Sequence, residues 1–199
     1  MTQIQGIIIR SYPSRESDLV LKVITKETGK LSLLAKYARK SRKKHGSSYD
    51  ILDKGRFETR EGKGSLLLVE SFIPEGGYRK IREDLNKITA ASVVLECTDI
   101  LIHEESGPGE DPYEILDLAL KAIDDAKDLK EILKSCFLGV GHLLNMAGFG
   151  TDEIYGVPSA KRLLGLLSTV EESGERKLES KTALIGLLEN LRAKAAISE

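Results

Sequence analysis

The chain has 199 residues, with 30 Lys or Arg, 31 Asp or Glu, a hydrophobic fraction of 41% and no Trp. This composition excludes a disordered chain, a collagen-like chain and a disulfide scaffold, and the length suits one domain or two small ones. No apolar run approaches the roughly 18 to 20 residues of a membrane span, and the N-terminus lacks the regions of a signal peptide. The two cysteines, Cys97 and Cys136, lie among apolar residues, which predicts buried thiols. We therefore expect a soluble cytoplasmic protein.

The net charge of -1 conceals a strong asymmetry along the chain. Residues 1–82 hold 18 Lys or Arg against 9 Asp or Glu, whereas residues 83–199 hold 12 against 22. The first part therefore carries a net charge of +9 and the second a net charge of -10. Such a difference indicates two regions with different partners, and the basic region favours a polyanion.

The N-terminal part of the sequence predicts five short strands. Apolar runs and period-two alternation place them at Gln3–Arg10, Leu19–Thr25, Leu31–Ala35, Ile51–Arg60 and Ser65–Phe72. Gly29 ends a tight turn after the second strand, where it is free to adopt a positive φ. Short strands joined by glycine turns favour a small barrel or strongly curled sheet. The five-stranded OB barrel is the commonest solution, and an SH3-like barrel remains an alternative.

The pattern changes at Pro74–Gly77, which we interpret as a short linker or a domain boundary because proline and glycine interrupt regular structure. Beyond it the apolar spacing becomes helical. It predicts helices at residues 84–103, from Pro112 onward with Asp111 as N-cap, at 128–147 with Gly148 ending the helix, at 158–169 and at 180–195. The predicted fold class is therefore α+β, with an N-terminal OB-fold β-barrel over residues 1–77 and an all-α helical bundle over residues 78–199.

Patterns typical of catalytic sites do not hold in this sequence. Gly62–Ser65 resembles the end of a phosphate-binding loop, but Phe57 stands where such a loop has its upstream glycine. Gly139–Gly141 lacks the third glycine of a dinucleotide fingerprint, because Leu144 occupies that position; close helix packing explains these glycines better. We therefore expect no enzymatic activity, no catalytic residues and no metal site.

The strongest functional signal is the basic segment Lys36–Lys44, which contains six positive residues in nine and no acid. It interrupts the strand series, so a compact scaffold presents it to a partner such as a phosphate backbone. Tyr37 offers a face for stacking on an unpaired base, with ordinary barrel packing as the alternative. The candidate DNA-binding residues are Lys36, Arg39, Lys40, Arg42, Lys43, Lys44, Arg10 and Tyr37. Arg15, Lys22, Lys30, Arg56 and Arg60 are further candidates for the positive surface.

The order of these features resembles a known bacterial family, the recombination mediator RecO. The resemblance rests on Gly6–Ser11, Glu16–Leu19, Thr25–Lys36, the basic segment that follows, and the strand Leu66–Glu70. In the helical part it continues through Asp84–Leu85, Ala90–Ser92 with Glu96, and Leu143–Phe149. It covers most of residues 1–150 and is most specific in the first 40 residues.

The resemblance implies a protein that binds single- and double-stranded DNA, anneals complementary strands and loads a recombinase together with RecR. It also implies that the helical domain docks the acidic tail of single-strand binding protein, for which Lys121, Lys130 and Lys134 are weak candidates. Many members carry a four-cysteine zinc site after the Gly-Phe pair that corresponds to Gly148–Phe149. No cysteine follows that pair here, so we expect no zinc and no cofactor, with residues 151–180 repacked by helix and loop contacts.

The leading hypothesis is therefore a non-enzymatic DNA repair and recombination mediator, cytoplasmic and associated with the nucleoid, with no membrane partner. Two alternatives remain open at this point. One is a protein-interaction adaptor whose basic barrel binds an acidic protein. The other is an OB-fold factor that binds a structured RNA.

Overall fold

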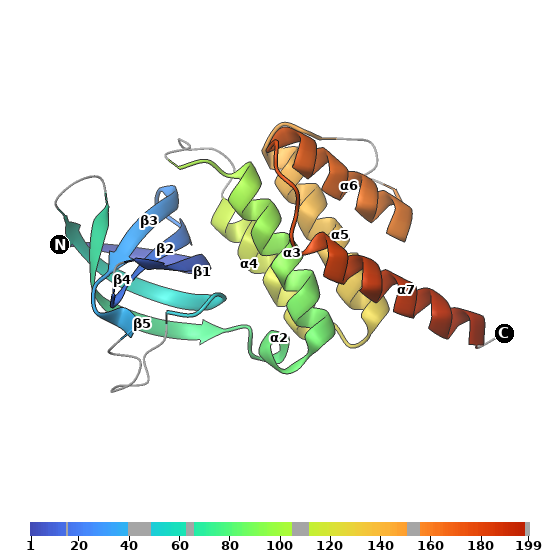
Figure 1. The fold of residues 1–199 in the computed structure, drawn as a ribbon, viewed down its shortest axis with the longest axis horizontal. Coiled ribbons are helices and arrows are strands. Elements are labelled where there is room, and N and C mark those ends of the chain that lie inside the picture. Colours follow the sequence, from blue (N-terminus) through green and yellow to red (C-terminus); the bar gives the residue numbers. More distant parts are fainter. Residues whose placement is uncertain (15, 40–48, 63–65, 105–111, 151–155, 198–199) are drawn as a thin grey trace. The chain divides into compact units, whose positions relative to one another are not determined.

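The computed structural model describes residues 1–14, 16–39, 49–62, 66–104, 112–150 and 156–197. The chain divides into two compact units (Figure 1). One comprises Met1–Gly77 together with Ile102–Glu114, and the other comprises Tyr78–Leu101 together with Ile115–Glu199.

The first unit is a closed five-stranded barrel (Figure 1). Its strands are β1 (Thr2–Ser14), β2 (Asp18–Thr25), β3 (Gly29–Ala35), β4 (Asp53–Glu61) and β5 (Leu67–Gly77). Their order around the barrel is β1-β2-β3-β5-β4, and β1 closes the ring by antiparallel pairing with β4. Only the pairing of β3 with β5 is parallel among these strands. This arrangement confirms the OB-type barrel predicted from the sequence.

The barrel interior is filled by side chains that alternate along the strands. Ile8, Leu21, Val23, Leu33 and Phe57 are fully buried in one cluster, and Phe72 lies beside Phe57 with ring centroids 4.6 Å apart. The neighbours Lys22 and Ser32 consequently face outward, because successive residues of a strand point to opposite sides. Gly29 has the positive φ expected of it, at 74°.

Pro74–Gly77 is not a linker, because strand β5 continues through these residues, but the leading segment of the first unit does end at Gly77. Pro74 pairs with Gly55 of β4, next to a register shift between Asp53 and Gly55. A bulge of this kind tolerates a proline, which has no N–H for the ladder. A Cβ at Gly55 would lie 2.2 Å from the Ile73 carbonyl oxygen, so the close approach of the two strands requires glycine there.

The second unit is built from helices that follow the barrel strands. They are α2 (Arg79–Glu83), α3 (Leu85–Leu101), α4 (Pro112–Asp125), α5 (Leu129–Met146), α6 (Ala160–Ser173) and α7 (Lys181–Ile197). The five predicted helices are confirmed, and the short α2 was not predicted. Helix α3 contacts α5, α6 and α7 and is buried on most of its circumference, which makes it the centre of this unit.

Two helix ends follow the capping chemistry of their residues. Asp128 accepts a hydrogen bond from the Glu131 N–H at 2.8 Å and so caps the start of α5. At the other end Gly148 has φ 82°, and the N–H groups of Gly148 and Phe149 bond to the carbonyls of Asn145 and Leu144. This pair of bonds is a Schellman motif, and it confirms the predicted role of Gly148.

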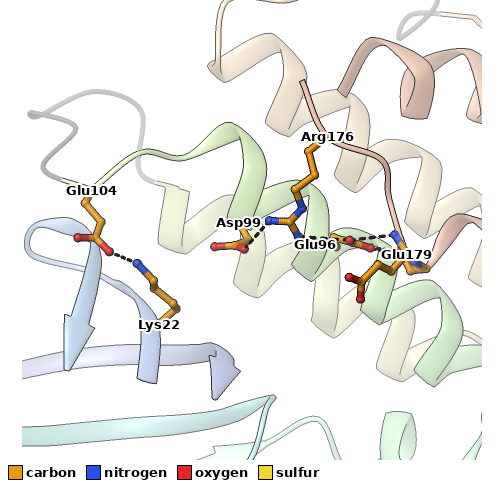
Figure 2. Close-up of polar contacts among 7 residues, drawn as sticks. Lys22, Glu96, Asp99, Glu104, Arg176 and Glu179 are labelled. Carbon is orange, nitrogen blue, oxygen red and sulfur yellow. Dashed lines mark hydrogen bonds and ion pairs between the residues drawn. The ribbon is translucent and has the colours of Figure 1, made fainter. Parts of the chain in front are cut away.

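The segment between α6 and α7 is fixed by Glu96 of α3 (Figure 2). Its carboxylate accepts bonds from the Ser180 N–H at 2.9 Å, the Ser180 hydroxyl at 2.7 Å and the Glu179 N–H at 3.0 Å. Arg176 pairs with the same group at 3.4 Å and with Asp99 at 3.7 Å. Burial opposes ionisation of Glu96, but these hydrogen bonds outweigh it and hold its pKa below the ordinary value.

Both cysteines are buried and free, as predicted, and burial raises the pKa of the Cys136 thiol to about 12. Among the residues outside the gaps named above, no group of three or more His, Cys, Asp or Glu side chains is arranged to hold a metal ion. Over the same residues, no helix has the length and apolarity required to cross a membrane.

Candidate nucleic-acid interface

The basic segment begins on the surface of the barrel, directly after β3. Lys36, Tyr37 and Arg39 are exposed, whereas Ala38 between them is buried in the barrel core. The Tyr37 ring is 65% exposed, which excludes barrel packing as its role. Four further candidates lie outside the described residues: Lys40, Arg42, Lys43 and Lys44.

The turn between β1 and β2 anchors this start of the basic segment. The Tyr37 N–H donates to the Asp18 carboxylate at 2.9 Å, and Asp18 is buried. The Arg39 N–H donates to the Ser17 carbonyl at 3.0 Å, and its guanidinium reaches the Glu16 carbonyl at 3.3 Å. Tyr37 adopts a left-handed conformation with φ 57°, which these bonds hold in place.

Sequence reasoning missed the role of Asp18. An acid at the first position of a strand reads as a solvated residue, and the antiparallel pairing of β2 with β3 brings it to Tyr37. The signal that was available is the Glu16–Leu19 segment, which entered the family resemblance without a structural reason. The bonds from this segment fix the direction in which Tyr37 and Arg39 leave the barrel.

A second group of candidates lies on β1. The Arg10 guanidinium lies over the Tyr12 ring, 5.6 Å from its centroid, which is a cation–π arrangement. A register shift between Ile8 and Arg10 places Arg10 opposite Lys22 of β2. Both Arg10 and Tyr12 are half-buried.

Several other cations of the barrel are already paired with acids. Lys22 pairs with Glu104, Arg60 with Glu70, and Arg56 with Glu75 at 2.6 Å. Lys30 is only 6% exposed, and Arg15 lies outside the described residues. Among the candidate cations that the structure describes, Lys36 and Arg39 are exposed directly after β3, and Arg10 lies two strands away on β1.

The glycine patterns that resembled cofactor loops have structural explanations. Gly139 and Gly141 are buried within α5, and a Cβ at Gly139 would lie 2.8 Å from the Ala119 Cβ of α4. Gly62 follows β4, where a Cβ would meet the Leu66 carbonyl oxygen at 2.6 Å. The remainder of that loop, residues 63–65, lies outside the described residues.

The three lysines proposed for protein docking lie on two helices of the second unit. Lys121 of α4 pairs with Asp117 one turn earlier, at 2.8 Å. Lys130 and Lys134 are exposed on α5 and, at a spacing of four residues, form one stripe with the 37% exposed Leu138. Leu118 on α4 is 64% exposed.

Comparison with known proteins places these features in a family. Residues 1–72 match the family model described as Recombination protein O N terminal. A protein named DNA repair protein RecO from Anaeromyxobacter sp. (strain K) is 30% identical over 138 residues, which cover 69% of this chain and 54% of the relative. The Listeria welshimeri protein of that name is 29% identical over 128 residues, 64% of this chain and 49% of its own length. The Symbiobacterium thermophilum protein of that name is 28% identical over 147 residues, which cover 73% of this chain and 56% of the relative.

The N-terminal barrel matches the RecO family model, and similarity to RecO proteins at about 30% identity extends over most of the chain. This confirms the resemblance drawn from the sequence. The matched stretches are longer than the barrel and therefore include residues of the helical unit. RecO is a family of recombination mediators and is not a known enzyme family. The chain spans about half the length of the curated RecO relatives it matches.

Proposed function

We propose that this protein is a DNA repair and recombination mediator. It binds single- and double-stranded DNA, anneals complementary strands and helps to load a recombinase onto DNA coated with single-strand binding protein. The observation that carries the proposal is the exposed start of the basic segment, anchored by Asp18 on a barrel of the RecO N-terminal family. A protein that acts on chromosomal DNA works in the cytoplasm at the nucleoid.

The proposed interface works by neutralising phosphates and stacking bases. Lys36 and Arg39 begin a series of cations that continues through Lys40, Arg42, Lys43 and Lys44. Phosphate contacts give affinity without sequence preference, and the exposed Tyr37 ring supplies a platform for an unpaired base. Annealing then requires no covalent chemistry, because screening two polyanions lowers the barrier to pairing while the bases stay accessible. We accordingly propose a non-enzymatic role.

Fluorescence anisotropy with a labelled single-stranded DNA oligonucleotide, titrated at several salt concentrations, tests this proposal. If about six phosphates are contacted, log K falls with log salt at a slope near -4, from roughly -0.7 for each contact. A variant with Arg39, Lys40, Arg42, Lys43 and Lys44 changed to Ala is expected to bind more weakly and with a slope of only about -0.7, because about one of the six contacts remains.

A matched control removes the same number of charges from the helical unit. It changes five exposed lysines to Ala: Lys127, Lys130, Lys134, Lys161 and Lys177. We expect this control to keep the salt slope of the unchanged protein. Absence of binding at low salt, or equal losses in both variants, would contradict a DNA interface at the basic segment.

We further propose that the helical unit receives a protein partner, the acidic tail of single-strand binding protein, with RecR as a second partner. Gly139 and Ala119 mark the crossing of α5 and α4, and the exposed Leu138 and Leu118 are their immediate neighbours in sequence. The stripe of Lys130, Lys134 and Leu138 offers positive charge beside apolar surface. That combination suits an acidic peptide with an apolar end.

A labelled acidic peptide that ends in aromatic and apolar residues tests the docking proposal. Lys134→Glu is expected to weaken peptide binding about fivefold, because it reverses a charge beside the apolar contact. Lys161→Glu on α6 carries the same charge change and is expected to have less than about half that effect. Equal effects of the two variants would indicate a general charge effect and no defined site.

A further inference from the structure

A row of polar side chains crosses three strands on the outer face of the barrel. Arg10 of β1 pairs in register with Lys22 of β2, and Lys22 pairs with Ser32 of β3. The neighbours of Lys22 and Ser32 along their strands belong to the buried core, so these two side chains face outward together. Two positive groups and a hydroxyl thus lie side by side across the sheet, with Arg10 next to the Tyr12 ring.

A carboxylate of the chain itself, Glu104, is paired with Lys22 of this row (Figure 2). One oxygen of Glu104 forms an ion pair with the Lys22 ammonium group and accepts a hydrogen bond from the Ser32 hydroxyl at 2.5 Å. Glu104 comes from the segment that follows α3, which belongs to the barrel unit and also bridges to Lys30 of β3. The hydrogen bonds from Lys22 and Ser32 hold the pKa of Glu104 below its ordinary value.

The geometry at this oxygen is one that a phosphate also satisfies. An ammonium group and a hydroxyl that converge on one anionic oxygen are the donors that proteins use for backbone phosphates. The Glu104 side chain is 44% exposed and Lys22 is 25% exposed, so the pair lies within reach of a ligand in solution. An ion pair with this exposure contributes little free energy. Exchanging the carboxylate for a phosphate therefore changes the free energy only slightly.

We propose that Lys22 and Ser32 form a phosphate subsite of the nucleic-acid interface, which Glu104 occupies in the free protein and vacates when a backbone phosphate binds. The inference rests on the proposed DNA-binding function and adds to it a second contact region, on β2 and β3, beyond the basic segment. Arg10 lies beside Lys22 in the same row, and it contacts the adjoining phosphate. Glu104 thereby lowers the affinity for nucleic acid, since binding requires its displacement.

Anisotropy titrations of single-stranded DNA with Glu104→Gln and a matched variant test this subsite. Gln keeps an oxygen for the Ser32 hydroxyl and removes the competing charge, so Glu104→Gln is expected to bind about threefold more tightly. Glu70→Gln removes an acid from another exposed ion pair of the barrel, with Arg60, and is expected to change the affinity less than about 1.5-fold. Thermal unfolding of both variants verifies that they remain folded.

A third variant asks whether Lys22 itself meets a phosphate. In the Glu104→Gln background, Lys22→Gln is expected to weaken binding about threefold and to reduce the steepness of the salt slope by about 0.7, the value for one contact. If Lys22→Gln leaves both quantities unchanged there, Lys22 contacts no phosphate and the subsite is overturned.

The remaining outcomes separate the subsite from the function on which it rests. If the unchanged protein binds DNA but Glu104→Gln and Glu70→Gln shift the affinity equally, the DNA-binding function stands and the subsite is overturned. If Glu104→Gln alone binds DNA, the subsite is supported and Glu104 acts as a strong competitor. If no variant binds DNA at low salt, the proposed function and the subsite both fail.

Discussion

Gly139 shows how a single residue sets the distance between two helices. It is buried in α5, and a Cβ there would lie 2.8 Å from the Ala119 Cβ and 3.5 Å from a Val94 methyl group. A contact of 2.8 Å between two carbon atoms is well inside their normal separation, and the Ala119 methyl has no rotamer by which to withdraw. The helices therefore approach as closely as a hydrogen atom on α5 permits.

Gly139→Ala is expected to lower the free energy of unfolding by about 1–2 kcal/mol, because overpacking outweighs the better helix propensity of alanine. Ala119→Gly alone is expected to cost about 1–2 kcal/mol, through lost propensity and one lost buried methyl. The double variant moves the methyl from α4 to α5 and is expected within about 1 kcal/mol of the unchanged protein. Urea denaturation of all four proteins measures the coupling, and additive losses would contradict the contact.

At the scale of elements, local patterns predicted most of the secondary structure. Alternation of apolar residues located the five strands, and the spacing of apolar residues located the five longer helices. Helix α2 was missed because its five residues are too few to show a period. The end of β5 was missed because Pro74 reads as a breaker, whereas a bulge in β5, with two residues opposite Lys54 of β4, accommodates it. Both errors concern information that a single segment does not carry.

The candidate site was predictable only in its charged part. The density of cations in Lys36–Lys44 is visible in the sequence, but the anchor at Asp18 lies 19 residues before Tyr37. The pairing of Lys22 with Glu104 spans 82 residues and joins β2 to a segment beyond α3. Neither contact leaves a periodic signal, since the first arises from the pairing of β2 with β3 and the second from the return of the chain to β3 after α3. The sequence therefore indicated Lys22 as a surface cation and contained no sign that Glu104 pairs with it.

At the scale of the whole molecule, several ionised carboxylates stabilise the fold at neutral pH. Their contribution is lost in acid, when they become protonated. Glu96, Glu104, Glu171 and Asp125 all have a pKa below the ordinary value; for the last three, bonds from Lys22, Lys181 and Lys80 are the largest cause. A lowered pKa contributes stability above the unfolded-state pKa, and this contribution is lost as pH falls through the folded-state pKa. At the alkaline end, the pKa of Cys136 is raised from 9.0 to about 12, so stability falls across that interval.

Glu96 is expected to account for a measurable share of the acid dependence, because its carboxylate orders the chain between α6 and α7. Glu96→Gln keeps one acceptor but loses the charge, and we expect a loss of about 1–2 kcal/mol in unfolding free energy at neutral pH. The loss is expected to shrink as pH falls from neutral through the lowered folded-state pKa of Glu96, because the carboxyl of the unchanged protein then becomes protonated. Urea denaturation across this pH range measures both quantities.

The control is Glu70→Gln, which breaks an exposed ion pair and is expected to lower the free energy of unfolding by less than about 0.5 kcal/mol. A deficit of Glu96→Gln that stays constant from neutral pH down to the onset of acid unfolding would mean that the shape of the Glu96 side chain, and not its charge, holds the start of α7.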